Sequence, residues 1–205
     1  MKTILTMGLV IGAIAVGGAS MLAQGPKVGQ PAPAFTATDD HGAARSLADF
    51  KGKFVVLEWH NNGCPYVQKH YGSGNMQKLQ KDWTAKGVVW LTIISSAPGT
   101  QGHVTAEQSQ AFMKQSGGAQ TAVLLDPTGI VGHLYDARNT PQMFLIDPKG
   151  TLVYDGAIDD KPTSNASDIA GAVNYVARAL TEAMAGKPVS TPVTVPYGCT
   201  VKYGR

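Results

Sequence analysis

Short apolar runs alternate with longer amphipathic segments between residues 54 and 155. Three of the runs are rich in β-branched and aromatic residues, and each predicts a buried strand: FVVLEW at 54–59, VVWLTII at 88–94 and AVLL at 122–125. The segments after these runs carry apolar residues at helical spacing or capping residues, and they predict helices over 65–86, 105–115 and 130–135. Gly72 and Gly74 should weaken or kink the first of these helices.

Two hairpins and a final helix complete the pattern. Residues 36–47 predict a hairpin that turns at Asp-His-Gly, and residues 142–155 predict a second one that turns at Pro-Lys-Gly. The segment 167–185 predicts a closing helix. The predicted fold is therefore α/β: a three-layer sandwich whose central mixed sheet is flanked by helices and extended by the N-terminal hairpin.

The N-terminus has the pattern of a secretory signal peptide. Lys2 gives a short positive region, residues 4–16 are apolar, and residues 17–23 are small and weakly polar. We expect cleavage after Ala23, with a site near Ser20 as the alternative. An uncleaved membrane anchor is the other interpretation, although the apolar run is shorter than the roughly 20 residues of a spanning helix. The protein is therefore expected to be exported, periplasmic or secreted, and to touch a membrane only through an uncleaved leader.

The composition fits one exported domain. The chain has 205 residues, of which 43% are hydrophobic, so it can bury one core. Its formal charge is +3, and no Lys/Arg run with interleaved aromatics occurs, which argues against nucleic acid as a partner. We divide it into a leader (1–23), one domain (24–186) and a Pro-rich tail (187–205). The two cysteines, Cys64 and Cys199, lie beyond the leader, in a compartment where disulfides persist.

Cys64 stands between a predicted strand and a predicted helix, in WHNNGCPY. Pro65 suits the first helical position, which places Cys64 at the helix N-terminus, where free N–H groups and the helix dipole favour a thiolate. The pKa of Cys64 should therefore be lowered, and a thiolate there can attack disulfides, sulfenic acids or peroxides. The other interpretation is a small buried hydrophobe, the usual fate of a free cysteine.

Neighbours of Cys64 are expected to serve the substrate. Gly63 leaves room for its approach. Asn61 and Asn62 shape the loop and donate hydrogen bonds to the sulfur or to the substrate. Tyr66, just past the cysteine, is expected to line a peptide-binding surface.

From about residue 27 to residue 180 the chain resembles the thioredoxin fold, in its redoxin branch. The resemblance rests on FVVLEWHNNGCPY, on Asn-Thr-Pro-Gln at 139–142 and on FLIDPKGTLVYDG. EWHNNGCPYVQKHY and the terminal PYGCTVKY are similar to a peroxiredoxin-like subgroup of the AhpC/TSA and TlpA-like proteins that keeps only the first cysteine of C-x-x-C. The resemblance implies thiol-disulfide or antioxidant chemistry that is carried by cysteine, without a cofactor.

The resemblance also implies roles for particular residues. Cys64 is the attacking cysteine, and Pro141 is a cis-proline whose loop lies against it. Thr140 precedes this proline, and its backbone would pair with a bound substrate chain. Glu58 matches a buried acid that moves protons for the thiols. In an apolar strand its pKa should rise, unless this strand position faces water.

The chain departs from its resemblances at several positions. Val67 replaces the second cysteine of C-x-x-C, so a cycle within that motif cannot run. The proline and threonine of the peroxiredoxin motif are here Leu57 and Asn61, and the arginine near the peroxide position is missing, with Pro141 in the equivalent stretch. Thiol peroxidase is therefore a weaker alternative.

Cys199, in VPYGCTVKY, is the candidate partner thiol. One hypothesis is that the tail folds back and Cys199 resolves the intermediate formed at Cys64, because closure entropy grows only slowly with loop length. A permanent structural disulfide between the two is the alternative, and it would add up to about 4–5 kcal/mol in the chain-entropy model. A third arrangement leaves the cysteines apart, with Cys199 on a partner's surface.

A metal site is a further weaker alternative. His60 and Cys64, together with His70 or the distant His103, have the donor types that copper or zinc binds. Histidines near a fold entrance are more often hydrogen-bonded surface groups, so we expect no metal and no other cofactor. Residues 159–161, Asp-Asp-Lys, are expected to form a solvated turn.

The leading hypothesis is an exported thiol-disulfide oxidoreductase with Cys64 as its nucleophile. Its partners would be protein or small-molecule disulfides and thiols, together with a reducing partner. The alternative from another class is a thioredoxin-fold binding module for a peptide, copper or zinc, in which Cys64–Cys199 is a fixed disulfide. The reactivity of Cys64 in the reduced protein would separate the two.

Overall fold

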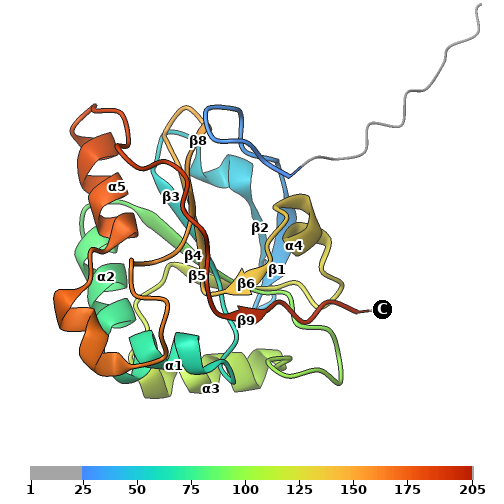
Figure 1. The fold of residues 1–205 in the computed structure, drawn as a ribbon. Helices are drawn as coiled ribbons and strands as arrows, with labels where there is room; N and C mark the ends of the chain where they lie inside the picture. The colour runs from blue at the N-terminus through green and yellow to red at the C-terminus, as the bar shows by residue number, and fades with distance from the viewer. Residues whose placement is uncertain (1–24, 205) are drawn as a thin grey trace, which may run out of the picture.

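The computed structural model describes residues 25–204, so the predicted leader lies outside the described residues. A seven-stranded sheet forms the centre, in the order β2-β1-β5-β4-β3-β7-β8 (Figure 1). Its strands are β1 (Thr36–Asp39), β2 (Ala44–Ser46), β3 (Val55–Trp59), β4 (Val89–Ile94), β5 (Ala122–Leu125), β7 (Gln142–Ile146) and β8 (Leu152–Gly156). A small second sheet pairs β6 (Asn139–Thr140) with β9 (Cys199–Thr200).

The central sheet is mixed, as the sequence predicts. β3 runs parallel to β4, and β4 runs parallel to β5, whereas β7 is antiparallel to β3 and to β8. The N-terminal hairpin β1–β2 extends the sheet through an antiparallel contact with β5. Side chains of β3 alternate between the two faces: Val55, Leu57 and Trp59 join one buried cluster, and Val56 joins the other.

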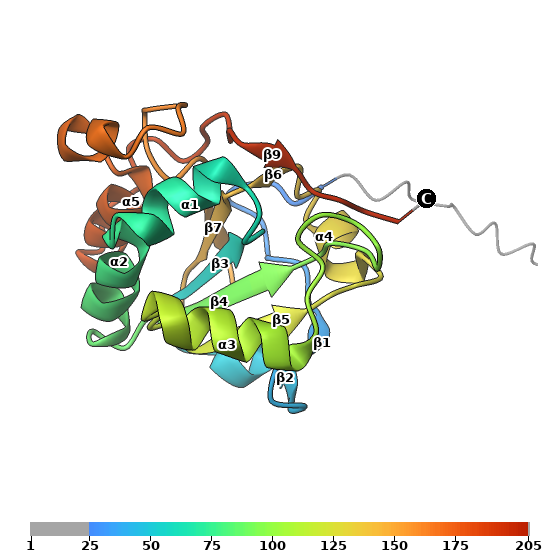
Figure 2. The same ribbon diagram turned by 90° about the horizontal axis from the view of Figure 1, so that it is seen from below.

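Helices cover both faces of the sheet and give the predicted three layers. One face packs against α1 (Pro65–Gly72), α2 (Asn75–Thr84), α3 (Ala106–Ser116) and α5 (Tyr175–Met184). The other face packs against α4 (Ile130–Leu134) and the short 3-10 helix η1 (Leu47–Phe50). Figure 2 shows α1, α2 and α5 at one side of the molecule and α4 at the other. None of the helices within residues 25–204 has both the length and the apolarity to cross a membrane.

Two helices differ from their prediction. The segment 65–86 forms two helices, because Gly74 adopts a left-handed φ of 78° between α1 and α2. The closing helix begins at Tyr175 instead of Ser167, where the side chain of Asn174 caps α5 by accepting from the Ala177 N–H group at 2.8 Å. The residues before it form a separate 3-10 helix, η2 (Ala166–Gly171).

The C-terminal tail folds back over the domain. The Asp155 N–H group donates to the Pro192 carbonyl and the Thr194 N–H group donates to the Asp155 carbonyl, both at 3.0 Å, so the tail first follows β8. It then crosses to the small sheet, where β9 pairs antiparallel with β6 and sets Cys199 opposite Thr140. Both ribbon views show β9 beside β6 (Figures 1 and 2). The tail thus brings Cys199 to the loop that carries Pro141.

Candidate functional site

Cys64 is the N-cap residue of α1, as the sequence predicts. It has extended backbone angles, and Pro65 occupies the first helical position. The loop is held locally, since the Cys64 N–H group donates to the Asn61 carbonyl at 3.0 Å and the Asn61 side-chain oxygen accepts from Gly63 N–H at 2.9 Å. The Cys64 side chain is 0% exposed. A thiol at the start of a helix is thus present, but solvent does not reach it.

Hydrogen-bonding groups surround the sulfur of Cys64. Its thiol donates to the Thr140 carbonyl oxygen, 3.1 Å away. Burial raises the pKa of Cys64, but the neighbouring Cys199 thiol, the Val67 N–H group and Thr140 bring this pKa below its ordinary value. Val67 lies in the first turn of α1, where N–H groups have no partner within the helix. The predicted lowering of the Cys64 pKa is confirmed.

The tail occupies the place that the resemblance gives to a substrate chain. The Thr140–Pro141 peptide bond is cis, which confirms that prediction. The backbone of Thr140 is paired with Cys199, and the Asn139 side chain donates to the Gly198 carbonyl at 3.0 Å. The pairing edge of this loop is therefore filled by the protein's own C-terminal segment.

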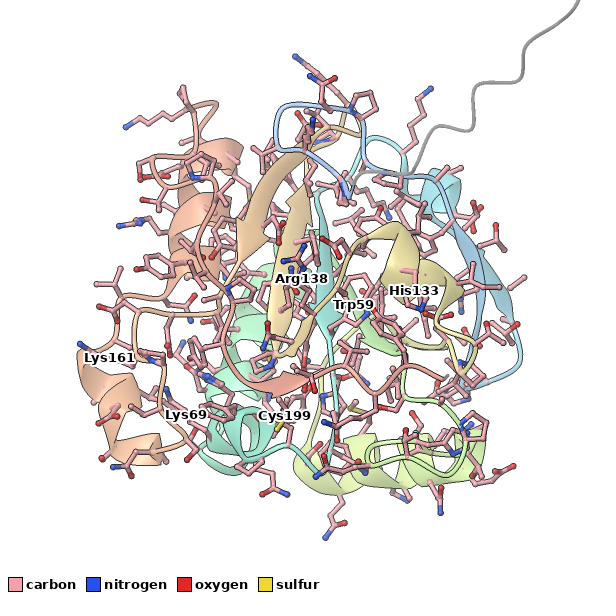
Figure 3. The ribbon with its side chains drawn as sticks, turned by 45° about the vertical axis from the view of Figure 1, so that its right-hand side comes forward. Trp59, Lys69, His133, Arg138, Lys161 and Cys199 are labelled. Atoms are coloured by element: carbon pink, nitrogen blue, oxygen red, sulfur yellow. The ribbon has the colours of Figure 1, made fainter. Side chains whose placement is uncertain are left out.

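The two thiols lie together, but their pKa values are shifted in opposite directions. Both cysteines are free, with Cys64 buried and Cys199 partly exposed. Burial and the hydrogen bond to Cys64 raise the pKa of Cys199 to about 11. Figure 3 places Cys199 on the tail and Lys69 on α1 at the same end of the molecule. The arrangement in which the two cysteines stay apart is not the one that this structure adopts.

Glu58 is buried at the centre of a hydrogen-bond network. Its carboxylate accepts from the Tyr71 hydroxyl at 2.9 Å, the Trp90 indole at 2.8 Å, the Gln80 amide at 3.2 Å and the Thr92 hydroxyl at 3.3 Å. Burial raises the pKa of Glu58, but the adjacent His60 ring, with Nδ1 3.4 Å from Oε1, and hydrogen bonds from Trp90 and Tyr71 bring it below its usual value. The predicted rise in this pKa was therefore wrong, because donors from distant segments stabilise the charged carboxylate.

The histidines of the proposed metal set are placed separately. His60 is buried, with Nδ1 3.4 Å from Glu58 Oε1 and its ring packed edge-on against Tyr71. His103 lies partly exposed on the loop before α3. Among residues 25–204, no group of three or more His, Cys, Asp or Glu side chains is arranged to hold a metal ion. The structure therefore does not assemble His60, Cys64 and His103 as a ligand set.

The other predicted loop residues are held by contacts with the rest of the protein, chiefly with Gln101. The amide nitrogen of Asn61 donates to the Gln101 carbonyl at 3.2 Å, and Asn62 accepts from Gln68 at 3.1 Å through its backbone. The space next to Gly63 was expected to be open, but the Gln101 side chain fills it, and its amide donates to the Gly63 carbonyl at 2.9 Å. Asn61 shapes the loop as expected, while its amide is engaged with protein.

A polar cluster beside the tail was not predicted from the sequence. Lys69 and His70 of α1 are buried together with Asp159, and the Tyr197 hydroxyl of the tail donates to the Asp159 carboxylate. Residues 159–161 were expected to form a solvated turn, but Asp159 is only 2% exposed, since α1 and the tail cover it. The ring of Tyr66 packs edge-on against Tyr197, 5.9 Å between centres, so Tyr66 also contacts the tail.

A thiol at a helix N-terminus that faces a cis-proline, on a mixed sheet between two helical layers, defines the thioredoxin-like class of redoxins. The model of the AhpC/TSA family matches residues 28–155, which is more than half of the chain. The chain therefore belongs to the AhpC/TSA family. The matched segment ends before the tail that carries Cys199.

Curated relatives include thiol-disulfide oxidoreductases. ResA of Bacillus subtilis (strain 168), named a thiol-disulfide oxidoreductase, is 30% identical over 125 residues, which cover 61% of this chain and 64% of ResA. The chain thus spans slightly less than two thirds of the length of ResA. The thioredoxin-like protein YneN of the same organism is 27% identical over 147 residues, which cover 71% of this chain and 81% of YneN.

Solved structures share the fold over most of the chain. An uncharacterized conserved protein from Geobacillus kaustophilus has a TM-score of 0.76 at 26% identity and covers 87% of this chain and 93% of its own. A hypothetical protein from Sinorhizobium meliloti 1021 has a TM-score of 0.74 at 25% identity and covers 88% of this chain and 97% of its own. These matches extend the similarity beyond the family segment.

Proposed function

We propose that the protein is an exported thiol-disulfide oxidoreductase in which Cys64 attacks and Cys199 resolves. The observation that carries this proposal is the contact between two free thiols whose pKa values are shifted in opposite directions. The more acidic thiol is the one that is ionised near neutral pH, and the thiolate is the attacking species. The relationship to ResA supports the same chemistry.

The reaction follows from this pair. The Cys64 thiolate attacks one sulfur of a protein or small-molecule disulfide, forms a mixed disulfide and releases the other sulfur as a thiolate. Cys199, after losing its proton, attacks the Cys64 sulfur, which releases the second substrate thiolate and leaves a Cys64–Cys199 disulfide. The substrate has then gained two electrons. A dithiol partner must return two electrons to the protein before the next cycle.

The remaining expected roles belong to this proposal. Thr140 and Pro141 form the edge where a substrate chain pairs after the tail has moved, and Tyr66 lies beside that edge. Glu58 keeps its expected role of moving protons for the thiols as part of this proposal, and its carboxylate accepts hydrogen bonds from Tyr71 and Trp90. Cysteine chemistry of this kind uses no metal or organic cofactor. Export is proposed from the leader pattern in residues 1–23.

A redox titration of the mature protein tests the proposal. The protein is equilibrated in graded glutathione and dithiothreitol buffers, its thiols are alkylated, and its mass is measured. A Cys64–Cys199 bridge that opens at a potential above roughly −300 mV supports a working couple. A bridge that resists reduction far below this value supports the binding module instead. If no bridge forms in oxidising buffer, Cys199 does not resolve.

A peroxide assay addresses the weaker alternative. Rapid oxidation of Cys64 by hydrogen peroxide, faster than its reaction with a disulfide, would make thiol peroxidase the better description. We expect the opposite order, because Asn61 stands where peroxiredoxins keep the threonine that binds peroxide, and their arginine is missing here. Both rates are measured by stopped-flow on the reduced protein.

A further inference from the structure

The tail closes the site that holds Cys64. Cys64 is fully buried, and Cys199 of the tail packs against the same cluster and hydrogen-bonds its sulfur. An external disulfide cannot reach a buried sulfur, so exchange requires the tail to move away first. The contacts that hold the tail in place therefore decide how often Cys64 can be reached.

Four polar side chains form a cluster where the tail packs against α1, two residues before Cys199. We call this cluster the tyrosine latch, and its members are Lys69, His70, Asp159 and Tyr197. The Tyr197 hydroxyl donates to Asp159, and its oxygen lies 3.4 Å from His70 Nε2. Lys69 Nζ lies 3.7 Å from the Asp159 carboxylate and 5.5 Å from the centre of the Tyr197 ring. Lys69, His70 and Asp159 are each at most 3% exposed.

The tautomer of His70 fits this arrangement. The Asn75 amide lies 2.9 Å from His70 Nδ1 and donates to it, which leaves the proton on Nε2 to donate to the Tyr197 oxygen. Tyr197 can then accept from His70 while it donates to Asp159. Lys69, His70 and Asp159 each have one partner outside the tail, since Lys69 donates to the Lys161 carbonyl at 2.8 Å, so the docked tail adds the Tyr197 hydroxyl to groups that are already partly paired.

Release of the tail would take a hydrogen-bond donor away from the buried Asp159 carboxylate. The Asp159 carboxylate keeps the Lys161 N–H group at 2.9 Å but loses the Tyr197 hydroxyl, and burial makes an unpaired acceptor costly. The chain bends at Gly198, which has a φ of 127°, and β9 begins directly after it, so anchoring Tyr197 fixes the start of the turn that brings Cys199 to Thr140. The rest of the tail has further anchors, such as Tyr203, whose hydroxyl donates to the Ala137 carbonyl.

We propose that the tyrosine latch holds the tail over Cys64, so that Tyr197 gates access to Cys64 and positions Cys199 for the resolving step. That Tyr197 gates access to Cys64 depends only on how the tail is held. That Tyr197 positions Cys199 for the resolving step rests on the proposed function. Tyr197 touches neither sulfur, and it acts through the tail. An extended peptide could then replace the tail at Thr140 only after the latch has opened.

The test compares alkylation of Cys64 with and without the Tyr197 hydroxyl. Both proteins carry Cys199→Ser, so that no disulfide can form and the rate reports docking of the tail alone. Iodoacetamide labelling of Cys64 is followed by peptide mass spectrometry. Tyr197→Phe should raise the rate about tenfold or more, because a hydrogen bond to a buried charged group is lost.

A matched control removes a similar bond elsewhere. The Ser109 hydroxyl on α3 donates to the buried Asp40 carboxylate at 2.7 Å, far along the chain from the latch. Ser109→Ala should leave the labelling rate of Cys64 unchanged. An unchanged rate in Tyr197→Phe, or an equal rise in both variants, overturns the gate. Thermal unfolding of each variant confirms that the labelled protein is folded.

A second readout addresses positioning. With Cys199 present, Tyr197→Phe should make the Cys64–Cys199 couple easier to reduce, by about 30 mV for each tenfold loss in the effective concentration of Cys199. An unchanged potential overturns the positioning role. If the unmodified protein forms no bridge at all, the proposed function fails, and the labelling comparison still decides the gate.

Discussion

The loop that carries Cys64 and the tail that carries Cys199 meet at one site but are built differently. The loop is fixed by short-range backbone contacts between a buried strand and a helix, and N–H groups of that helix face the sulfur. The tail forms a strand of only two residues, and side chains far apart in the sequence hold it. Local structure thus places Cys64 at the start of a helix, whereas the contact with Cys199, which the tail supplies, is the largest influence that lowers its pKa.

The largest expected difference between the two regions is in activity. Cys64→Ser removes the attacking sulfur, so release of thiol from a small aromatic disulfide should fall to the rate of buffer alone. Cys199→Ser leaves the attack by Cys64 intact but removes the resolving thiol. This variant should therefore accumulate as a mixed disulfide at Cys64. Absorbance of the released thiol and the mass of the unreduced protein measure the two steps. A mixed disulfide on Cys199 in the Cys64→Ser variant would contradict this division of roles.

A methyl group added at Gly198 should detach the tail from the loop that carries Thr140. Gly198 has a φ of 127°, and an added Cβ would lie 2.1 Å from the Thr140 carbonyl oxygen. We expect Gly198→Ala to undock the tail and raise Cys64 labelling by roughly a hundredfold. Gly204→Ala, on the same tail, is the control, because its Cβ would meet nothing closer than Ala97 at 3.6 Å. Similar rates in both variants would mean that pairing with Thr140 does not hold the tail.

Acid should loosen the tail region first. Burial lowers the pKa of His70 from 6.5 to about 4, although Asp159 acts in the opposite direction. Below pH 6.5 His70 takes up a proton in the unfolded chain, whereas in the native protein it does so only near pH 4. The free energy of unfolding should therefore fall by up to about 3 kcal/mol between these values. Urea unfolding at several pH values measures this loss.

A matched pair of variants assigns that loss to His70. His70→Gln keeps an acceptor for Asn75 but cannot take up a proton, so its stability should depend less on pH over this range. His41→Gln is the control, since the side chain of His41 is 73% exposed and its substitution should leave the pH dependence unchanged. Equal pH dependence in His70→Gln and the unmodified protein would contradict the argument.

The smallest expected effect is in the pH profiles of the two thiols. Labelling of Cys64 should level off at a lower pH than labelling of Cys199, because the pKa of Cys64 lies below its ordinary value and that of Cys199 is about 11. Peptide mass spectrometry of the reduced protein gives both midpoints. If the midpoints coincide, the helix N-terminus does not distinguish the two sulfurs.

The sequence predicted the loop well because its signals are adjacent. A buried strand, Gly-Cys-Pro and a helix follow one another within residues 54–72, and they are enough to place Cys64 at the start of α1. The predicted direction of its pKa shift was right, but Cys199 and Thr140, which lie outside this segment, contribute to it together with the Val67 N–H group. The cis bond before Pro141 came from resemblance instead, and the structure confirms it.

The errors concern groups whose partners are distant in sequence. Glu58 was assigned a raised pKa because its strand neighbours are apolar, while its donors come from α1, α2 and β4. Asp159 looked solvated because it stands next to Asp160 and Lys161, while α1 and the tail enclose it. No local pattern reports such contacts, since they form only when segments that are distant in the sequence pack together.

The first part of the tail also covers β8, the last strand of the central sheet. Pro192 and Thr194 bond the backbone of Asp155, which would otherwise belong to an open edge. An exposed strand edge is a template on which a second chain can add and begin to aggregate. If opening of the latch spreads to residues 192–194, it uncovers this edge, and the solubility of the protein then depends on how quickly the tail returns.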